Sequence, residues 1–369
     1  MNVCFYFAAA QEKDGGINRY SKGIVEALDN NIIKKYTFND NNFDLENMKR
    51  LHHNYTSVKN MDHIAREEYF LSKAHGIDIF HSFYPLIPVS RYKDVRTTLT
   101  IHDVVPLINK EWCGSSEITF SFFKNELFQE AQRVDRVITN SEYTKSTVVD
   151  YYGIKPENIT VVYPGVEPAV DEYKITEEDS CLVRQKYNID KDYILSICTL
   201  EPRKNLISLI RAYEIYREKH ILSDVKLVLT GKLGWKFDGI LESIKLSKFS
   251  KDIILTDYVT DEELAILYTD ALCFAYVSYY EGFGTPILEA LSKGKAVLSS
   301  KTTSMPEAGG NAACYCDPYD IDSIYSGLER LIEDATYRKS LEEKAVIHAS
   351  KFSYKKSAQV LLNVFEELA

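Results

Sequence analysis

The 369-residue sequence has no stretch of eighteen or more apolar residues, so it predicts no transmembrane helix. Its first residues, MNVCFYFAAAQEKDGG, have no basic leader and indicate a first buried strand in place of a signal peptide. We therefore expect a cytoplasmic protein. Hydrophobic residues make up 45% of the chain, which is enough for each of two domains to bury a core.

The chain also has little excess positive charge: its formal net charge is −10, and no segment carries a basic stripe. Nucleic-acid binders carry such a basic face, so we expect no nucleic acid among the partners. An acidic protein that binds an anionic ligand must concentrate its cations at one place. The few clustered Arg and Lys residues are therefore the ones to consider.

Paired cysteine spacings and dinucleotide fingerprints are missing as well. The seven cysteines are scattered, and Cys314 and Cys316 have no second Cys/His pair at zinc spacing, so we expect buried thiols in a reducing compartment. The pattern G-x-G-x-x-G is absent, which disfavours a dehydrogenase. No lysine has a convincing Schiff-base context, which disfavours pyridoxal phosphate.

Apolar strand-like runs alternate with amphipathic helical patterns along the whole chain, which is typical of α/β folds with parallel sheets. We predict strands within 3–9, 77–83, 96–103, 136–141, 159–165, 193–200, 226–232, 253–259, 271–278, 295–300 and 313–317. Residues 166–180 are acidic and aperiodic and are predicted to be a linker, and the polar residues 39–62 a mobile loop. We expect a first domain of residues 1–168 joined by a C-terminal helix, 352–369, and a second domain of residues 169–351.

Two cations follow the strand predicted at 193–200. In Glu201-Pro202-Arg203-Lys204-Asn205, we expect Asn205 to cap the next helix. A helix N-terminus carries roughly half a positive charge, so Arg203 and Lys204 oppose it unless an anion binds there. This favours a phosphate site at the carboxyl edge of a sheet, with ordinary solvated surface cations as the alternative.

A second loop, Ser278–Glu289, follows the strand predicted at 271–278. Its glycines allow close approach of backbone amides to a ligand, and we expect Thr285 to cap a helix with Pro286 in its first turn. Two phosphate sites on neighbouring strand ends suit a diphosphate. A carboxylate would repel phosphate, so Glu281 and Glu289 are expected to bind hydroxyls on either side of the diphosphate. A nucleotide sugar has such hydroxyls, and we expect Glu281 to bind those of the sugar and Glu289 those of the ribose.

The first domain offers weaker candidates. Gly15-Gly16 follows the first strand and allows a loop to fold over a polar ligand, although a plain turn explains it nearly as well. His102 lies near the end of the strand predicted at 96–103, where it could bond a hydroxyl of a sugar donor near the carbon that reacts. Asp103 could fix the tautomer of His102 or act nearby. A structural histidine is the alternative.

Two further patterns have simple structural explanations. Asp320-Ile321-Asp322 matches a D-x-D metal pattern but precedes a helix, where capping explains the aspartates, so we predict no metal. In the Phe-rich segment 118–131, one helical stripe joins Phe120, Phe123 and Leu127. We expect it to pack between a helix and a sheet, with membrane docking or an acceptor platform as alternatives.

Together these residues resemble retaining glycosyltransferases of family 4, which have the GT-B fold. Glu281 to Glu289 is similar to the E-x7-E motif of that family, and TLEPRKNL is similar to its Arg/Lys diphosphate site. Gly15-Gly16 resembles the family's glycine loop and Ile101-His102-Asp103 its cleft histidine, whereas Asn18 departs from a glycine often seen there. The resemblance extends over essentially the whole chain.

The resemblance implies two Rossmann-like doubly wound domains facing a central cleft, the first for the acceptor and the second for a nucleotide sugar. It implies a catalytic set of His102, Asp103, Arg203, Lys204 and Glu281. It implies a donor-binding set of Gly15, Gly16, Gly231, Tyr258, Val259, Gly282, Phe283, Gly284, Thr285 and Glu289. The EPRKN variant is similar to a branch rich in mannosyltransferases, which favours GDP-mannose over UDP-sugars.

We therefore expect retaining transfer of a hexose to a glycan or lipid-linked glycan in polysaccharide biosynthesis, without a metal or cofactor. Arg203 and Lys204 would stabilise the leaving diphosphate. Front-face attack and double displacement both stay open, as does peripheral contact with the cytosolic membrane face. The alternatives are a nucleotide-sugar 2-epimerase, a glycan phosphorylase and a non-catalytic nucleotide-sugar sensor.

Overall fold

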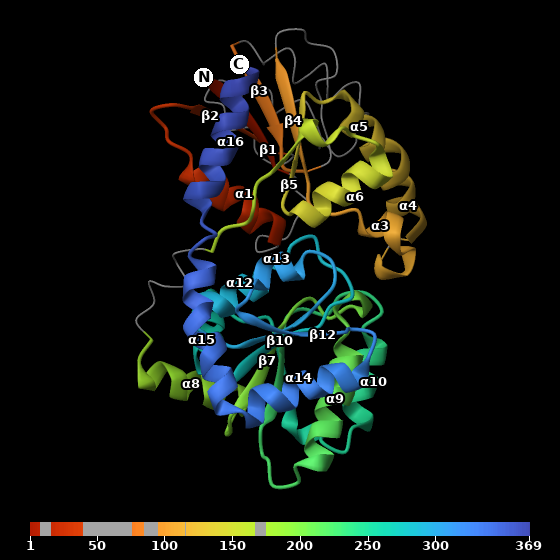
Figure 1. The fold of residues 1–369 in the computed structure, drawn as a ribbon, viewed down its shortest axis with the longest axis vertical. Helices are drawn as coiled ribbons and strands as arrows, with labels where there is room; N and C mark the ends of the chain where they lie inside the picture. The colour runs from red at the N-terminus through yellow and green to blue at the C-terminus, as the bar shows by residue number, and fades with distance from the viewer. Residues whose placement is uncertain (8–15, 40–75, 85–94, 115, 167–174) are drawn as a thin grey trace, which may run out of the picture. The chain divides into compact units, whose positions relative to one another are not determined.

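The computed structural model describes residues 1–7, 16–39, 76–84, 95–114, 116–166 and 175–369 (Figure 1). By its internal contacts the chain divides into two compact units. Unit 1 contains residues 1–108, 117–165 and 353–369, and unit 2 contains residues 109–116 and 166–352. None of the described helices combines the length and the apolar character that crossing a bilayer requires.

Unit 1 is built on a six-stranded parallel sheet in the order β2-β1-β3-β4-β5-β6. Its strands are β1 (Asn2–Phe7), β2 (Lys34–Asn39), β3 (Ile79–Ser82), β4 (Arg96–Ile101), β5 (Arg136–Thr139) and β6 (Ile159–Val161). Five of the six lie where the sequence predicts strands. The exception is β2, whose sequence KKYTFN lacks an apolar run because it lies at the edge of the sheet.

The helices of unit 1 that the structure describes are α1 (Gly16–Ala27), α3 (Val105–Ile108), α4 (Ser116–Ser121), η3 (Phe122–Leu127), α5 (Phe128–Arg133), α6 (Glu142–Tyr152), η4 (Pro156–Asn158) and α16 (Tyr354–Leu368). Helix α16 is the predicted C-terminal helix, and it lies beside α1 (Figure 1). Leu361 and Phe365 of α16 join Phe5 and Ile24 in one core. Gly23 is required at this contact, because a Cβ atom there would lie 2.6 Å from the ring of Tyr354.

The Phe-rich segment 118–131 is helical but irregular, since η3 is a stretch of π-helix between α4 and α5. A π turn adds one residue to the turn and so changes which side chains share a face. Leu127 is buried, and Phe122 and Phe123 pack against the same core. Phe123 and Leu127 of the predicted stripe therefore pack into this core as expected, together with Phe122, which the stripe did not include.

Unit 2 is built on a second six-stranded parallel sheet, in the order β12-β11-β10-β7-β8-β9. Its strands are β7 (Tyr193–Ile197), β8 (Lys226–Thr230), β9 (Ile253–Asp257), β10 (Cys273–Tyr276), β11 (Val297–Ser300) and β12 (Ala313–Cys316). All six lie where the sequence predicts strands. Counted within the unit, the order is 3-2-1-4-5-6, the Rossmann arrangement of doubly wound dinucleotide-binding folds.

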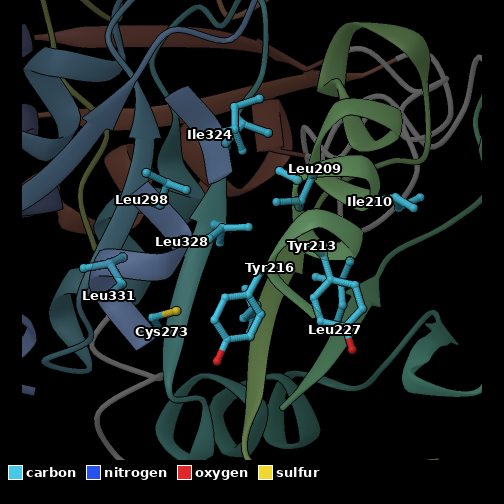
Figure 2. Packing of buried hydrophobic residues seen from close by; sticks show 14 of the residues in the cluster. Leu209, Ile210, Tyr213, Tyr216, Leu227, Cys273, Leu298, Ile324, Leu328 and Leu331 are labelled. Carbon is cyan, nitrogen blue, oxygen red and sulfur yellow. The ribbon is translucent and has the colours of Figure 1, made fainter. Parts of the chain in front are cut away.

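The described helical segments of unit 2 are η2 (Lys110–Trp112), α8 (Glu177–Tyr187), η5 (Pro202–Lys204), α9 (Leu206–Lys219), α10 (Asp238–Leu246), η6 (Ser250–Asp252), α11 (Asp261–Asp270), α12 (Thr285–Ser292), α13 (Met305–Gly309), α14 (Ile321–Glu333) and α15 (Ala335–Ala349). Figure 2 shows how α9 and α14 pack over the sheet. Tyr213 and Tyr216 of α9 meet Leu328 of α14 in a core that also contains Leu227 and Leu298 of the strands.

Local signals in the sequence explain several helix ends. Thr260 and Glu263 form the expected capping box of α11, and Asp320 caps α14 through the amide of Asp322, as predicted for the D-x-D pattern. The predicted linker 166–180 is partly wrong, because α8 begins at Glu177. Its residues 167–174, and 40–62 of the predicted loop, lie outside the described residues.

Candidate active site

The carboxyl ends of β7 and β10 form the candidate site of unit 2. These two strands are neighbours in the sheet, yet the chain leaves β7 toward β8 and leaves β10 toward β11, on the opposite side. Such a reversal of strand order opens a crevice between the two following loops, and doubly wound folds bind ligands there. The two motifs that the sequence singles out follow these two strands.

Four side chains from the two loops form a charge cluster, which we define as Glu201, Arg203, Lys204 and Glu281. Glu281 Oε1 accepts a hydrogen bond from Lys204 Nζ at 2.7 Å, and Glu281 Oε2 accepts one from Arg203 Nη1 at 2.9 Å. Arg203 Nη2 lies 2.6 Å from Glu201 Oε1. The structure therefore brings Arg203, Lys204 and Glu281 together, and adds Glu201.

The charge cluster is buried and electrically balanced. Its side chains are at most 16% exposed, and two carboxylates face two cations. Burial alone would raise the pKa of Glu281, but Arg203 and Lys204 outweigh it and hold that pKa at about 2. Burial raises the pKa of Glu201 against the opposing effect of Arg203. Glu281 is thus ionised at neutral pH and is an internal counter-ion of both cations.

Tyr276, the last residue of β10, completes this arrangement. Sequence analysis did not single it out, because it ends an apolar strand. Lys204 Nζ donates to the Tyr276 hydroxyl at 2.9 Å and lies 5.3 Å from the centre of its ring. Burial raises the pKa of Tyr276 well above 10, so the phenol stays neutral. Tyr276 therefore fixes the position of the Lys204 ammonium group without adding charge.

Backbone contacts tie the two loops to each other. Arg203 Nη1 donates to the carbonyl of Tyr280 at 2.7 Å, and the amide of Tyr279 donates to the carbonyl of Arg203 at 2.9 Å. Ser304 Oγ holds the carbonyl of Glu281 at 2.8 Å. The cations are therefore held on both sides before any ligand binds, which is the preorganisation that electrostatic catalysis requires.

Of the two predicted caps at these loops, Asn205 is right in position and Thr285 is wrong. Asn205 is the N-cap residue of α9, but it has a left-handed backbone, and its side chain donates to the carbonyls of Val277 and Pro318 in place of a capping bond. Gly284, at φ +103°, is the N-cap of α12, and Thr285 is already helical. Asn205 and Gly284 hold these positions for the same reason. The tight reversal after each strand needs a positive φ, which Gly and Asn adopt most readily.

The remaining donor-site candidates of unit 2 lie at the same edge of the sheet. Gly282, Phe283 and Gly284 are buried in the loop after β10. Glu289 lies in α12, outside the charge cluster, and accepts a hydrogen bond from the Tyr268 hydroxyl at 2.7 Å.

Gly231, Tyr258 and Val259 follow β8 and β9. Gly231 must be glycine, because at φ +137° a Cβ atom would lie 2.0 Å from the Cys198 carbonyl oxygen. Tyr258 is half exposed beside Lys232, whereas Val259 is buried.

In unit 1, His102 lies at the end of β4. Its Nε2 atom is 3.0 Å from the carbonyl oxygen of Phe83, which can only accept, so Nε2 carries the proton and Nδ1 is the acceptor. Burial lowers the pKa of His102 to about 4, so the ring is neutral at pH 7. Phe83 thus fixes the tautomer, and the carboxylate of Asp103 instead accepts from the amide of Val105. Gly16 begins α1, and Gly15 lies outside the described residues.

The predicted absence of a metal site stays a prediction. In the part of the chain that the structure describes, no three His, Cys, Asp or Glu side chains gather as a metal would need. The seven cysteines are all free thiols, and four of them are buried.

Unit 2 is doubly wound and has two cations at its switch point, the place where the strand order reverses, and the same chain also contains a second parallel α/β unit. This combination is that of the GT-B class of glycosyltransferases. The comparisons with known proteins agree. Residues 182–348 match the family described as glycosyl transferases group 1, and residues 36–170 match glycosyltransferase family 4. With one match in each unit, the chain belongs to the family 4 glycosyltransferases.

Curated relatives include the O-antigen chain mannosyltransferase B of Escherichia coli, 29% identical over 74% of this chain and 71% of the relative. The serotype-specific mannosyltransferase WbdA of the same species is 31% identical over 74% of this chain, and the match spans about a third of WbdA (34%). Among solved structures, Anabaena HepE in complex with UDP and glucose has a TM-score of 0.75 at 17% identity, covering 99% of both chains. The glycosyltransferase WaaG has a TM-score of 0.70 at 15% identity, covering 98% of this chain and 99% of WaaG.

Proposed function

We propose that this protein is a retaining glycosyltransferase that transfers mannose from GDP-mannose to a glycan or lipid-linked glycan in polysaccharide biosynthesis, without a metal. The observation that carries the proposal is the charge cluster at the switch point of unit 2, where Lys204 and Arg203 are held in fixed positions by Tyr276 and Glu281. The mannosyltransferases among its relatives support the choice of sugar.

The Lys204 ammonium group and the Arg203 guanidinium both have a chemistry that suits a diphosphate. The ammonium group has three N–H donors, of which Tyr276 and Glu281 take two among the described residues, so the third can donate to a phosphate oxygen. The guanidinium has five donors in a planar fork that suits phosphate. As the bond between the sugar C1 and the diphosphate oxygen breaks, its electron pair stays on that oxygen, where these two cations stabilise it.

The arrangement of Glu281 favours front-face attack over double displacement. Both of its carboxylate oxygens are bonded to cations, so neither is a good nucleophile for the sugar carbon. The acceptor hydroxyl would then attack C1 on the face that the diphosphate leaves, and its proton would pass to the departing phosphate oxygen. One C–O bond breaks, one forms, and the configuration at C1 is retained.

Binding and turnover of named nucleotide sugars test the proposal. GDP-mannose is expected to raise the melting temperature more than GDP-glucose, UDP-glucose or UDP-N-acetylglucosamine, since a ligand that binds only the native state stabilises it. Lys204→Ala should abolish transfer with the fold retained, whereas Lys344→Ala, at an exposed position of α15, should not. Wild-type turnover in Lys204→Ala would remove the diphosphate role, and conversion of UDP-N-acetylglucosamine without an acceptor would show an epimerase.

A further inference from the structure

Asn140 lies next to His102 at the carboxyl edge of the unit 1 sheet. Strands β4 and β5 are parallel neighbours, and their last paired residues are Ile101 and Thr139. The following residues, His102 and Asn140, therefore leave the sheet side by side. Thr144 supports this neighbourhood, because its hydroxyl lies 3.4 Å from the carbonyl oxygen of His102.

The side chain of Asn140 has no structural task that the described residues reveal. The residue is only 7% exposed, yet its Oδ1 atom has no hydrogen-bond partner among them. The neighbouring Ser141, and not Asn140, caps α6 by accepting from the amide of Thr144 at 2.9 Å. Most buried polar side-chain atoms in folded proteins are paired, and an unpaired one destabilises the fold. A buried amide oxygen without a partner at a ligand-binding edge thus points to a partner that arrives with a ligand.

The chemistry of this pair of side chains limits what that ligand is. His102 is neutral and presents Nδ1 as an acceptor, because Nε2–H is bonded to Phe83. The amide of Asn140 donates and accepts, and its terminal torsion is soft enough to turn it toward the edge. Neutral donors and acceptors without a cation suit sugar hydroxyls and not phosphates.

We propose that Asn140 binds a hydroxyl group of the acceptor sugar, beside His102. The inference rests on the proposed function, because it assumes that a glycan enters unit 1. Asn140 is then a specificity residue for the acceptor, and the hydroxyl it binds donates to the Oδ1 atom that the described residues leave without a partner.

The test is Asn140→Leu, which keeps the size of the side chain and removes its polar atoms. With GDP-mannose as donor and α-linked mannobiose as acceptor, we expect the acceptor KM to rise about three- to tenfold, the effect of one lost hydrogen bond. The donor KM should stay within about twofold. The melting temperature should stay equal or rise, since a buried unpaired atom is removed. Asn363→Leu, on an exposed position of α16, is the matched control and should change neither constant.

Three results would overturn the inference: an unchanged acceptor KM, a donor KM that rises in its place, or a fall in melting temperature that accounts for the loss. If wild-type turnover on mannobiose is too slow to measure, saturation-transfer NMR compares mannobiose binding by wild type and Asn140→Leu, and equal or absent binding also counts against it. Failure of the proposed function would look different, because GDP-mannose would then not stabilise the wild-type protein at all.

Discussion

At the scale of single residues, the hydroxyl of Tyr276 is the contact whose removal is most informative. Tyr276→Phe keeps the buried ring but removes the 2.9 Å bond from Lys204. Hydrogen bonds to charged groups contribute about 1.5–3 kcal/mol, so kcat/KM is expected to fall by roughly tenfold or more. Steady-state kinetics with GDP-mannose measure this.

The control for that variant is Tyr193→Phe. Tyr193 is equally buried, in β7, and its hydroxyl donates to the carbonyl of Leu267 at 2.8 Å, which makes it a purely structural tyrosine. Both variants should lose some stability, but only Tyr276→Phe should lose turnover. Equal kinetic losses in the two would mean that Tyr276 acts through the fold and not through Lys204.

A second residue-scale prediction concerns His81 in β3, which the sequence did not single out. Its ring nitrogens lie 2.7 Å and 3.2 Å from the hydroxyls of Thr98 and Thr100, and burial lowers its pKa to about 3. The unfolded chain binds a proton near pH 6.5 and the folded chain does not. The free energy of unfolding is therefore unaffected by this titration above pH 6.5 and decreases as the pH falls from there toward 3, by on the order of 5 kcal/mol in total.

Urea unfolding between pH 7.5 and pH 4 measures that loss. His81→Gln removes the titrating group, so its unfolding free energy should vary less with pH than that of the wild type. Parallel curves for the two proteins would assign the pH dependence to other groups.

How far the site could be predicted depends on where each residue sits. Arg203, Lys204 and Glu281 were predictable because polar residues that follow strands gather at one edge of a parallel sheet. Tyr276 and Asn140 were not, since one ends an apolar strand and the other lies in a plain strand-to-helix turn. Their roles depend on which strands are neighbours, which comes from sheet order and not from spacing.

At the scale of elements, Asn205 decides how α9 begins. Its left-handed backbone, at φ +57°, reverses the chain, and its side chain donates to two carbonyls. Asn205→Ala should cost about 2–3 kcal/mol, because it loses both bonds and strains the backbone. Asn205→Gly should cost about 1 kcal/mol less, because glycine adopts this φ freely. Denaturant unfolding gives both values, and an equal cost would show that backbone strain is not part of the effect.

Sequence patterns predicted most helices and strands. They missed the elements whose structure depends on contacts with other parts of the fold. Strand β2 has the polar sequence KKYTFN and becomes a strand by pairing with β1 along its whole length. The π turn at Phe122–Leu127 leaves no mark in a pattern of apolar residues. The acidic start of α8 looked like a linker because the capping box, in which Thr176 is the N-cap and Asp179 bonds back to it, precedes a helix with few buried residues.

At the scale of the whole molecule, the chain begins and ends in unit 1. Phe365 of α16 is fully buried in the core that β1 and α1 share. Phe365→Ala should therefore destabilise unit 1 by about 3–5 kcal/mol. Nucleotide binding by unit 2 should persist, since its residues end at Phe352.

Isothermal titration with GDP on folded Phe365→Ala, together with hydrogen exchange resolved by segment, separates the two effects. Faster exchange confined to unit 1 is expected. Lost GDP binding by a folded variant would show that the donor site depends on unit 1. The division into two parallel α/β units was predictable from alternating patterns, whereas the assignment of residues 109–116 to unit 2 was not, because no composition change marks them.

Negative and positive charges alternate through the charge cluster, in the order Glu201, Arg203, Glu281 and Lys204. This order limits which of these residues can be substituted alone. Removing one member of a buried ion pair leaves the charge of its partner buried and unpaired, which lowers the free energy of unfolding by about 3–5 kcal/mol. Substitution of Glu281 is therefore expected to occur together with substitution of Arg203 or Lys204, because Glu281 is the counter-ion of both cations. Loss of Glu201 alone still leaves Arg203 paired with Glu281.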